Sequence, residues 1–310
     1  MRWLCVFILW IGLPGFTPAG YAQDGAVSGQ EILRLTQEYL NAAPKRYIGS
    51  AGHAEAEAFI RNHFKPELDK GDFVDDRFTA LTPIGPLTMH NLIVKFPSTS
   101  PTRRNGIIVL ASHYETNYWL KDIHFVGAND GACTTALLIA LGEYYRLHPP
   151  QGYSVWLLFT DGEESIDKEW TDRDSLYGSR HMAAKWSADG TIGRIKAFVL
   201  ADMIGWKNLN IDRETDSTPW LLELLARAGR ETGHSQYLFK HSLAIEDDHL
   251  PFLERGVPSL DVIDFEYGTP TDPEAYHHTE QDTMDKLSAA SLQVSADLFL
   301  ELVKLIDQRQ

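Results

Sequence analysis

The sequence predicts a single α/β domain with a mixed, mostly parallel central sheet that is flanked by helices. Three observations support this fold class. Continuous apolar runs of strand length recur along the chain, helical runs alternate with them, and no internal repeat or long linker interrupts the order. Continuous apolar runs indicate strands that are buried on both faces, and strand–helix alternation is typical of parallel sheets covered by helices.

The N-terminal part of the domain is predicted to contain two helices and an edge pair of strands. Ser28 and Glu31 have the spacing of a capping box, so a helix begins at Ser28. Residues 54–64 form a second helical run. Residues 77–81 and 91–96 are rich in β-branched and aromatic side chains, and we expect them to pair as antiparallel strands.

Beyond a surface loop at residues 97–106, buried strands and helices alternate to the end of the chain. The predicted strands are residues 107–112, 153–160, 195–203 and 257–265. The predicted helices are residues 132–147, 174–186, 218–231 and 288–306. In an open α/β sheet, ligands bind at the carboxyl ends of the strands. The residues that follow each strand are therefore the first candidates for a functional site.

The overall composition excludes some classes of partner. The chain has 310 residues, of which 44% are hydrophobic and 23% charged, and its formal net charge is -15. A strongly acidic protein is a poor ligand for nucleic acid, whose phosphates attract basic surfaces, and for anionic lipid. We therefore predict no nucleic-acid partner and no membrane association of the mature chain.

The first 22 residues have the features of a secretory signal peptide. Arg2 supplies a positive charge, residues 3–13 form a short apolar run, and small residues precede a cleavage site after Ala22. The predicted mature domain is residues 23–310, and the protein is predicted to be secreted or periplasmic. Only Cys133 would remain after cleavage, so no internal disulfide is expected and Cys133 is interpreted as a buried packing residue.

Histidines and carboxylates follow several of the predicted strands. They are His113, Glu115, Asp130, Asp161, Glu163, Glu164, Asp202, the acidic run at residues 246–249, and His277 and His278. Each alone has a structural explanation as a cap, a turn residue, a solvated side chain or a hydrogen-bonded core histidine. Together at one rim they would repel one another unless a cation neutralised them.

Carboxylates and imidazoles without thiolates favour Zn²⁺ or a similar transition metal over Ca²⁺ and Mg²⁺. Two carboxylates and one histidine would leave one position of a tetrahedral zinc site open, which is typical of catalysis. Adjacent side chains in an extended stretch point in different directions. One of Glu163 and Glu164 could therefore bind the metal while the other carries protons beside it.

The motifs HYE, GANDGA, DGEE, LADMIG and HHTEQDT, in that order, resemble the zinc aminopeptidase family (peptidase M28-like), whose members use two metals. Residues 174–186 and 246–260 are more similar still to the animal-type glutaminyl cyclases, the glutaminyl-peptide cyclotransferases, which share that fold. The resemblance extends from about residue 28 to residue 306. It implies a phosphorylase/hydrolase-like fold and conversion of an N-terminal glutamine into pyroglutamate with release of ammonia.

The resemblance also implies roles for individual residues. One zinc ion would be held by Asp130, Glu164 and His278. Glu163 would be the general acid/base, in a hydrogen-bond network with Asp202 and Asp247. Trp170 would form an aromatic wall of the substrate pocket. The partners implied are peptides or proteins that begin with glutamine, and we expect the enzyme to be a monomer.

Four positions depart from the cyclase pattern. Glu246 replaces a glutamine and His277 replaces a tryptophan, and both are assigned to substrate binding. Asp261 replaces a histidine, and Ser112 stands where the animal enzymes have one cysteine of a disulfide. None of these departures removes a residue that matches a zinc ligand or the general acid/base.

Two other functions remain open from the sequence. A secreted aminopeptidase would bind two zinc ions, the second through His113 and Asp202, with Asp130 bridging the pair and Glu163 activating water. A non-catalytic ectodomain would use the same fold only to bind a partner. The products formed from a peptide that starts with glutamine would distinguish a cyclase from an aminopeptidase. Zinc binding would distinguish both enzymes from a non-catalytic ectodomain.

Overall fold

The computed structural model describes residues 27–309 and has a six-stranded central sheet with the strand order β1-β2-β4-β3-β5-β8. The strands of this sheet are β1 (Phe73–Thr82), β2 (Gly85–Phe96), β3 (Ile107–His113), β4 (Ser154–Thr160), β5 (Ile195–Asp202) and β8 (Ser259–Ile263). The β1–β2 and β2–β4 pairs are antiparallel, whereas β4–β3, β3–β5 and β5–β8 are parallel. The sheet is therefore mixed and mostly parallel, as predicted.

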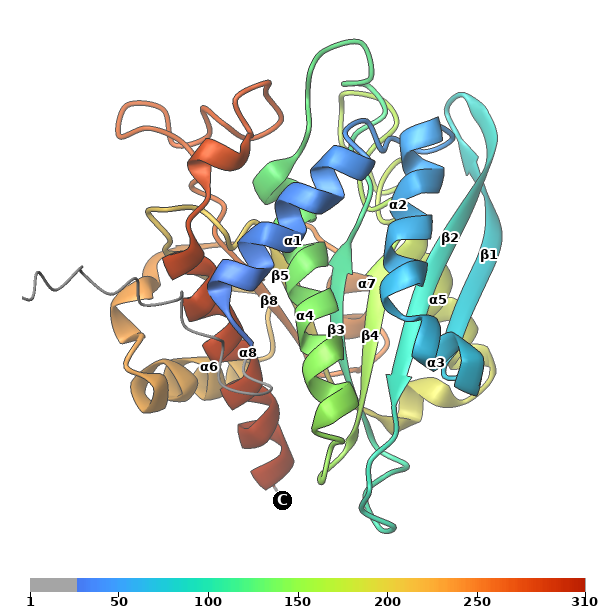
Figure 1. Cartoon of the computed structure of the whole chain (residues 1–310), viewed down its shortest axis with the longest axis vertical. Helices are drawn as coiled ribbons and strands as arrows, with labels where there is room; N and C mark the ends of the chain where they lie inside the picture. Colours follow the sequence, from blue (N-terminus) through green and yellow to red (C-terminus); the bar gives the residue numbers. More distant parts are fainter. Residues whose placement is uncertain (1–26, 310) are drawn as a thin grey trace, which may run out of the picture.

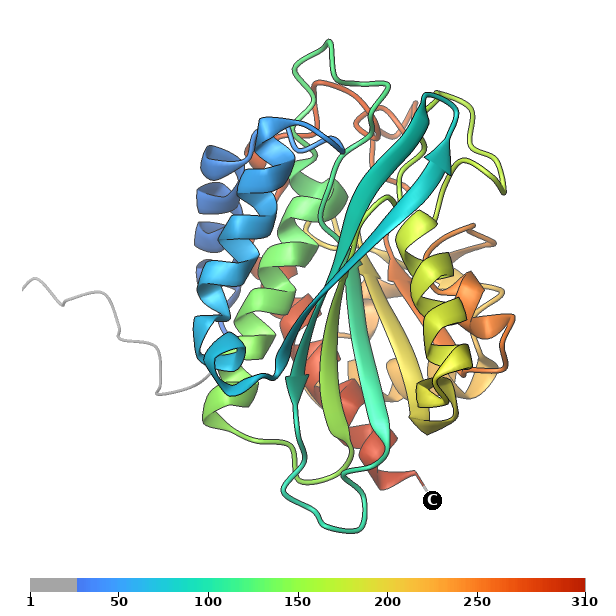
Figure 2. The same cartoon turned by 90° about the vertical axis from the view of Figure 1, so that its right-hand side faces the viewer.

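Helices cover both faces of this sheet (Figures 1 and 2). They are α1 (Gly29–Ala42), α2 (Ala51–His63), α3 (Lys65–Lys70), α4 (Cys133–Leu147), α5 (Tyr177–Ala188), α6 (Pro219–Thr232), α7 (Leu250–Leu253) and α8 (Ala289–Gln308). The larger core lies between the sheet and α1, α2, α4, α6 and α8, and the smaller core lies under α5 and α7. The predicted α/β architecture, a central sheet flanked by helices, is confirmed.

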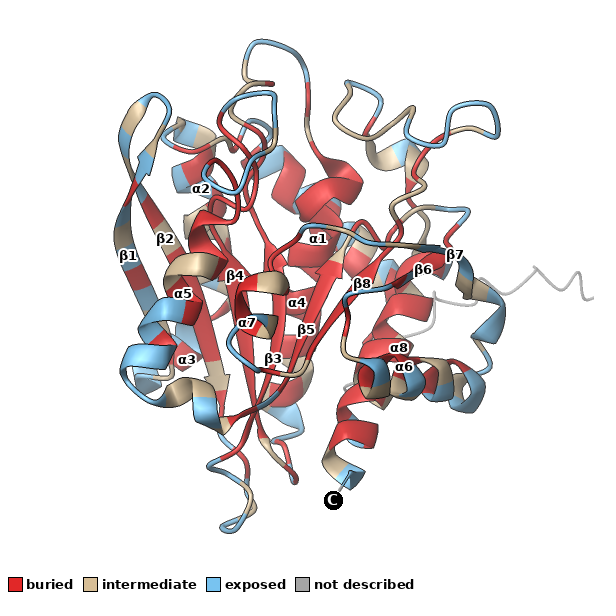
Figure 3. Cartoon of the chain, turned by 180° about the vertical axis from the view of Figure 1, so that it is seen from behind, coloured by how far each residue is buried: buried red, intermediate tan, exposed pale blue. Residues whose placement is uncertain are grey.

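The two cores follow from the alternation of side chains along each buried strand. In β3, Ile108 and Leu110 pack into the larger core, whereas Val109 and Ala111 pack into the smaller one. All seven residues of β3 are buried, and so are all seven of β4. Figure 3 shows this buried centre and the more exposed β1–β2 edge. The continuous apolar runs of the sequence therefore indicated central strands correctly.

Two helix starts agree with the sequence analysis, one through its capping residue and one through its buried first residue. The Ser28 side chain accepts a hydrogen bond from the backbone N–H of Glu31 and caps α1. Cys133 is the first residue of α4, is fully buried and forms no disulfide within residues 27–309. The interpretation of Cys133 as a packing residue is thereby confirmed.

A second sheet was not predicted. It consists of two parallel strands, β6 (Ile211–Glu214) and β7 (Leu238–Leu243), which lie on either side of α6 in the sequence. The β6 strand has only four residues, with the sequence IDRE, and most of β7 is partly or fully exposed. Strands this short and polar lack the apolar pattern from which strands are recognised.

The carboxyl ends of the parallel strands point toward one end of the molecule. The long connections after β3, β4 and β8 gather there, at the top of Figure 1. These connections carry most of the predicted site residues. The predicted signal peptide, residues 1–22, lies outside the described residues. Within residues 27–309, no helix combines the length and the apolar character needed to cross a bilayer.

Candidate metal centre and active site

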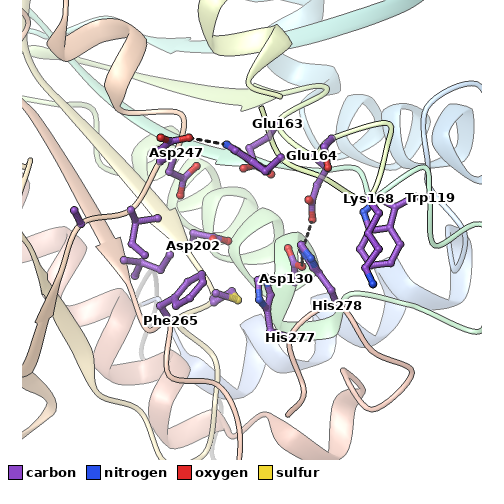
Figure 4. Close-up of a pocket in the computed structure, with 17 residues that line it drawn as sticks. Trp119, Asp130, Glu163, Glu164, Lys168, Asp202, Asp247, Phe265, His277 and His278 are labelled. Carbon is purple, nitrogen blue, oxygen red and sulfur yellow. Dashed lines mark hydrogen bonds and ion pairs between the residues drawn. The ribbon is translucent and has the colours of Figure 1, made fainter. Parts of the chain in front are cut away.

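The three side chains predicted to bind zinc come together at the carboxyl ends of the strands (Figure 4). Asp130 precedes α4, Glu164 follows β4, and His278 lies between β8 and α8. The Nε2 atom of His278 is 3.3 Å from Asp130 Oδ2 and 3.1 Å from Glu164 Oε1. Three connections that are far apart in the sequence therefore place two carboxylates around one imidazole.

The backbone around Asp130 is held by a neighbouring carboxylate. The side chain of Asp282 accepts hydrogen bonds from the backbone N–H groups of Asn129 (2.8 Å) and Asp130 (3.1 Å). Gly131 follows with φ +80, and a Cβ atom there would lie 2.8 Å from the ring of His113. Only glycine combines this left-handed conformation with such a close approach. The GANDGA motif is thus a turn that presents Asp130 to the site.

His278 also has an unusual backbone conformation, with φ +53. A non-glycine residue with positive φ is uncommon and costs conformational energy, and such residues concentrate at functional sites. The turn places the rings of His277 and His278 side by side, with centroids 3.8 Å apart. Both rings therefore face the same cavity, although neighbouring side chains in an extended segment would point apart.

The donor set fits a zinc ion. Asp130 Oδ2 is buried and makes no well-formed hydrogen bond, although His278 Nε2 is only 3.3 Å away. Burial would lower the pKa of His278, but the charge of Glu164 and the contact with Asp130 raise it well above its usual value. Carboxylate oxygens and an imidazole nitrogen that converge in this way are suitable ligands for Zn²⁺, and they leave a coordination position for substrate.

Three further carboxylates, those of Glu163, Asp202 and Asp247, line a cavity of about 420 Å³ next to this donor set. Burial, followed by the charge of Glu164, raises the pKa of Glu163 well above its usual value. Burial and the charge of Asp202 do the same for the pKa of Asp247. The three carboxylates share the cavity, but among the described residues no direct hydrogen bond joins them. The predicted network would therefore need a bound water or substrate between them.

The residues considered for a second metal also lie together. His113 Nε2 is 3.1 Å from Asp130 Oδ1 and 3.4 Å from Asp202 Oδ1, and His113 and Asp130 are buried. Glu115 is buried as well, and its carboxylate accepts a hydrogen bond from the backbone N–H of Glu164. The ligand atoms of His113, Asp130 and Asp202 lie within 4.8 Å of one another. This group could hold a metal ion in addition to the first donor set.

The three side chains predicted to contact substrate all line the same cavity. The indole Nε1 of Trp170 donates a hydrogen bond to Glu246 Oε2 over 3.1 Å. The ring of His277 packs edge-on against Phe265, with centroids 5.1 Å apart. Burial, followed by the charge of His278, lowers the pKa of His277 to about 4. His277 is therefore a neutral imidazole at ordinary pH, available for a hydrogen bond.

Sequence reasoning missed several residues of the site. Trp119, Lys168 and Phe265 line the cavity. The side-chain amide of Asn117 donates to the carboxylate of Glu164 and lies 3.2 Å from His278 Nε2. These residues lie in irregular connections without a motif. Closeness in the sequence was the one available signal, since Asn117 comes two residues after Glu115 and Lys168 four residues after Glu164.

Asp161 has a structural role, which the sequence left open. Its carboxylate lies 2.8 Å from Nε2 of His53 in α2 and accepts a hydrogen bond from the backbone N–H of His90 in β2. The side chain is fully buried and does not line the cavity. Of the three acids that follow β4, Asp161 braces the turn, whereas Glu163 and Glu164 face the site.

Comparisons with known proteins agree with this geometry. Residues 91–303 match peptidase family M28. The glutaminyl-peptide cyclotransferase of Drosophila melanogaster is 33% identical in a match that covers 70% of this chain and 66% of that enzyme. The glutaminyl-peptide cyclotransferase of Boiga irregularis is 31% identical in a match that covers 78% of this chain and 73% of the relative.

A solved structure gives a stronger match. The crystal structure of an Acidobacteriales bacterium glutaminyl cyclase superposes with a TM-score of 0.89 at 60% sequence identity, and it covers 95% of this chain and 100% of its own. The family match, the identity to the curated relatives and the shared fold all point to one group of proteins. The chain belongs to peptidase family M28 and, within it, to the glutaminyl-peptide cyclotransferases.

Proposed function

We propose that this protein is a zinc-dependent glutaminyl-peptide cyclotransferase that converts the N-terminal glutamine of peptides and proteins into pyroglutamate and releases ammonia. One observation carries the proposal. A chain 60% identical to a glutaminyl cyclase places a buried glutamate, Glu163, directly beside a converging Asp–Glu–His donor set. This arrangement supplies a proton carrier next to a position that can polarise a carbonyl group.

The reaction forms one bond and breaks another within the same residue. The α-amino nitrogen of the glutamine attacks the γ-carboxamide carbon, and the bond from that carbon to the amide nitrogen breaks. Glu163 accepts a proton from the attacking amine and delivers it to the departing nitrogen, which leaves as ammonia. A raised pKa suits this task, because Glu163 must both accept and release a proton near neutral pH.

Asp130, Glu164 and His278 would hold the zinc ion. When bound there, zinc would supply Lewis-acid polarisation of the γ-carbonyl group. The side-chain amide of Asn117 donates a hydrogen bond to the Glu164 carboxylate, which fixes the direction of that ligand.

The remaining cavity residues orient the substrate. Asp202 and Asp247 face the cavity beside Glu163, where they can bind the α-amine and keep it near the proton carrier. Phe265 and Trp170 provide apolar walls that restrict a flexible glutamine side chain to ring-closing conformations. Much of the rate gain in a cyclisation of this kind comes from such orientation.

A two-metal aminopeptidase is the second candidate, and the cluster of His113, Asp130 and Asp202 favours it. In that enzyme Glu163 would activate water for hydrolysis instead of transferring a proton between two nitrogens. The similarity to glutaminyl cyclases over nearly the whole chain makes the cyclase the better proposal. The predicted signal peptide supports secretion or export to a periplasm.

Mass spectrometry of the products tests the proposal. A peptide that starts with glutamine should lose 17 Da as one molecule of ammonia and keep its full length. Release of free glutamine would instead identify an aminopeptidase.

Glu164→Ala and His278→Ala should each lose zinc and turnover together, as measured by metal analysis and ammonia release. If both variants kept their zinc and activity, the assigned metal centre would be wrong.

A further inference from the structure

The exposed residues of the cavity mark its mouth. Most lining residues are buried or half-buried, whereas Lys168, Ala244 and Glu246 are exposed. The mouth therefore carries one cation and one anion. Because the first residue of a peptide substrate reacts inside the cavity, the rest of the peptide must leave between these side chains. This step rests on the proposed function.

The two charges at the mouth differ in how far they are already paired. The Glu246 carboxylate accepts a hydrogen bond from the indole of Trp170, and this bond holds the carboxylate next to Trp170. Lys168 has no ion-pair partner within 4.0 Å among the described residues, although Asp167 and Glu169 are its neighbours in the sequence. Its Nζ atom lies 5.9 Å from the ring centroid of Trp119, on the side of the cavity away from Asp247 (Figure 4).

Lys168 also lines a second, shallower groove. This groove has a volume of about 510 Å³ and includes Leu81 and Pro83 near the β1–β2 turn and Arg173 in the connection after β4. The carboxylates of Asp167, Glu169 and Asp174 line it as well, so Lys168 and Arg173 are the cations that an acidic peptide would meet there. Leu81 is 81% exposed. The two hollows share Lys168, so a peptide that leaves the reaction cavity on this side passes its ammonium group before it reaches the groove.

We propose that Lys168 forms a subsite for a carboxylate on the residues that directly follow the substrate glutamine, so that the enzyme prefers Asp or Glu at the second or third position of the peptide. The ammonium group lies 5.9 Å from the centroid of the Trp119 ring, at the outer limit of a cation–π contact, and Lys168 is exposed, so the charge is available to an acidic partner. The net charge of -15 and the Glu246 carboxylate would otherwise repel such peptides. Lys168 offsets that repulsion at the point where the peptide emerges.

The size of the preference follows from the exposure of Lys168. Exposed ion pairs are weak and are screened by salt, so we expect a preference of about two- to five-fold at low ionic strength. The preference should shrink toward unity at about 0.5 M salt. A larger, salt-independent preference would require a buried contact, which an exposed lysine does not provide.

The test compares kcat/KM for four peptide amides, Gln-Glu-Ala, Gln-Ala-Glu, Gln-Lys-Ala and Gln-Ala-Lys. The wild-type enzyme should favour the acidic peptide at one or both positions, and Lys168→Glu should reverse the acidic-to-basic ratio. Lys70→Glu is the matched control. It makes the same change in net charge at an exposed lysine in α3, far from the cavity, and should leave the ratio unchanged.

The outcomes separate this inference from the proposed function. If all four peptides release ammonia but Lys168→Glu leaves the ratio as in the wild type, the subsite is wrong and the cyclase assignment stands. If Lys70→Glu shifts the ratio as much as Lys168→Glu, the effect is one of overall charge and the subsite is also wrong. If no peptide cyclises, the proposed function itself fails. Zinc content and the melting temperature of Lys168→Glu should match the wild type, so that a folding defect is recognised.

Discussion

Glu163 and Glu164 are neighbours in the chain, but their surroundings differ. The Glu164 carboxylate is bonded by Asn117 and lies against His278, whereas Glu163 faces the open cavity. Two adjacent carboxylates therefore have two environments, and Glu164 is the one that lies against the imidazole of the proposed metal centre. Because burial raises the pKa of Glu163, this side chain is suited to proton transfer.

Replacement of Glu163 by glutamine tests this difference at a single residue. Glu163→Gln keeps the size of the side chain but cannot carry a proton, so kcat should fall by about 10²- to 10⁴-fold. Zinc content should remain at the wild-type level, as measured by metal analysis. Glu164→Gln is the matched control and should lose zinc as well as activity. Loss of zinc from Glu163→Gln would show that Glu163 is a ligand instead.

At the scale of single residues, the sequence predicted the site residues that lie in motifs and missed those that do not. Asp130, Glu164 and His278 lie in recognisable motifs and converge as expected. Trp119 and Asn117 lie in an irregular connection, where no spacing rule places a side chain. Their positions depend on how the connections pack against one another, which a local pattern does not encode.

At the scale of elements, a buried pair joins α2 to the end of β4. His53 Nε2 lies 2.8 Å from Asp161 Oδ1, and the imidazole stacks on the ring of Tyr114, with centroids 5.5 Å apart. The two residues of the pair are separated by 108 positions in the chain. The sequence could not pair them, since a helix in the N-terminal region offers no signal of which strand end it covers.

The same pair should make stability depend on pH. Burial would lower the pKa of His53, but the charge and hydrogen bond of Asp161 raise it to about 9, above its usual value of 6.5. Protonated His53 therefore stabilises the fold fully below about pH 6.5, and this contribution is lost as the pH rises through about 9. The shift corresponds to at most about 3 kcal/mol.

Urea unfolding of wild-type protein and His53→Gln at pH 6 and pH 9.5 measures this contribution. The difference in the free energy of unfolding between the two proteins should be larger at pH 6 than at pH 9.5. Zinc should be kept at the same saturating concentration throughout, so that metal binding does not vary between samples. A difference that is equal at both pH values would contradict a charged His53–Asp161 pair.

At the scale of the whole molecule, the sequence predicted the architecture because the central strands are apolar and long. The runs that became β3 and β4 are buried at every position, and such runs indicate a doubly covered sheet. The short strand β6 was missed because its polar residues, such as Asp212 and Arg213, do not form an apolar run. Apolar runs in the sequence therefore predict the core layers, but they do not predict small peripheral strand pairs such as β6–β7.

Removal of the metal should lower the stability of the entire domain. Without zinc, the carboxylates of the site repel one another in a buried setting, and a ligand that binds only the folded state stabilises it by mass action. Treatment with a chelator should lower the melting temperature by several degrees, and added Zn²⁺ should restore it. The Glu164→Ala variant should respond little to either treatment. An unchanged melting temperature in the wild type would contradict a metal bound at this centre.

The spacing of the proposed zinc ligands along the chain also affects when the ion can be acquired. Asp130 and Glu164 belong to the middle of the polypeptide, whereas His278 comes near its end, just before α8. During synthesis on the ribosome, the first two emerge long before the third. A nascent or prematurely terminated polypeptide that stops before His278 lacks the imidazole, so retention of an ion at this proposed centre would report that translation has passed residue 278.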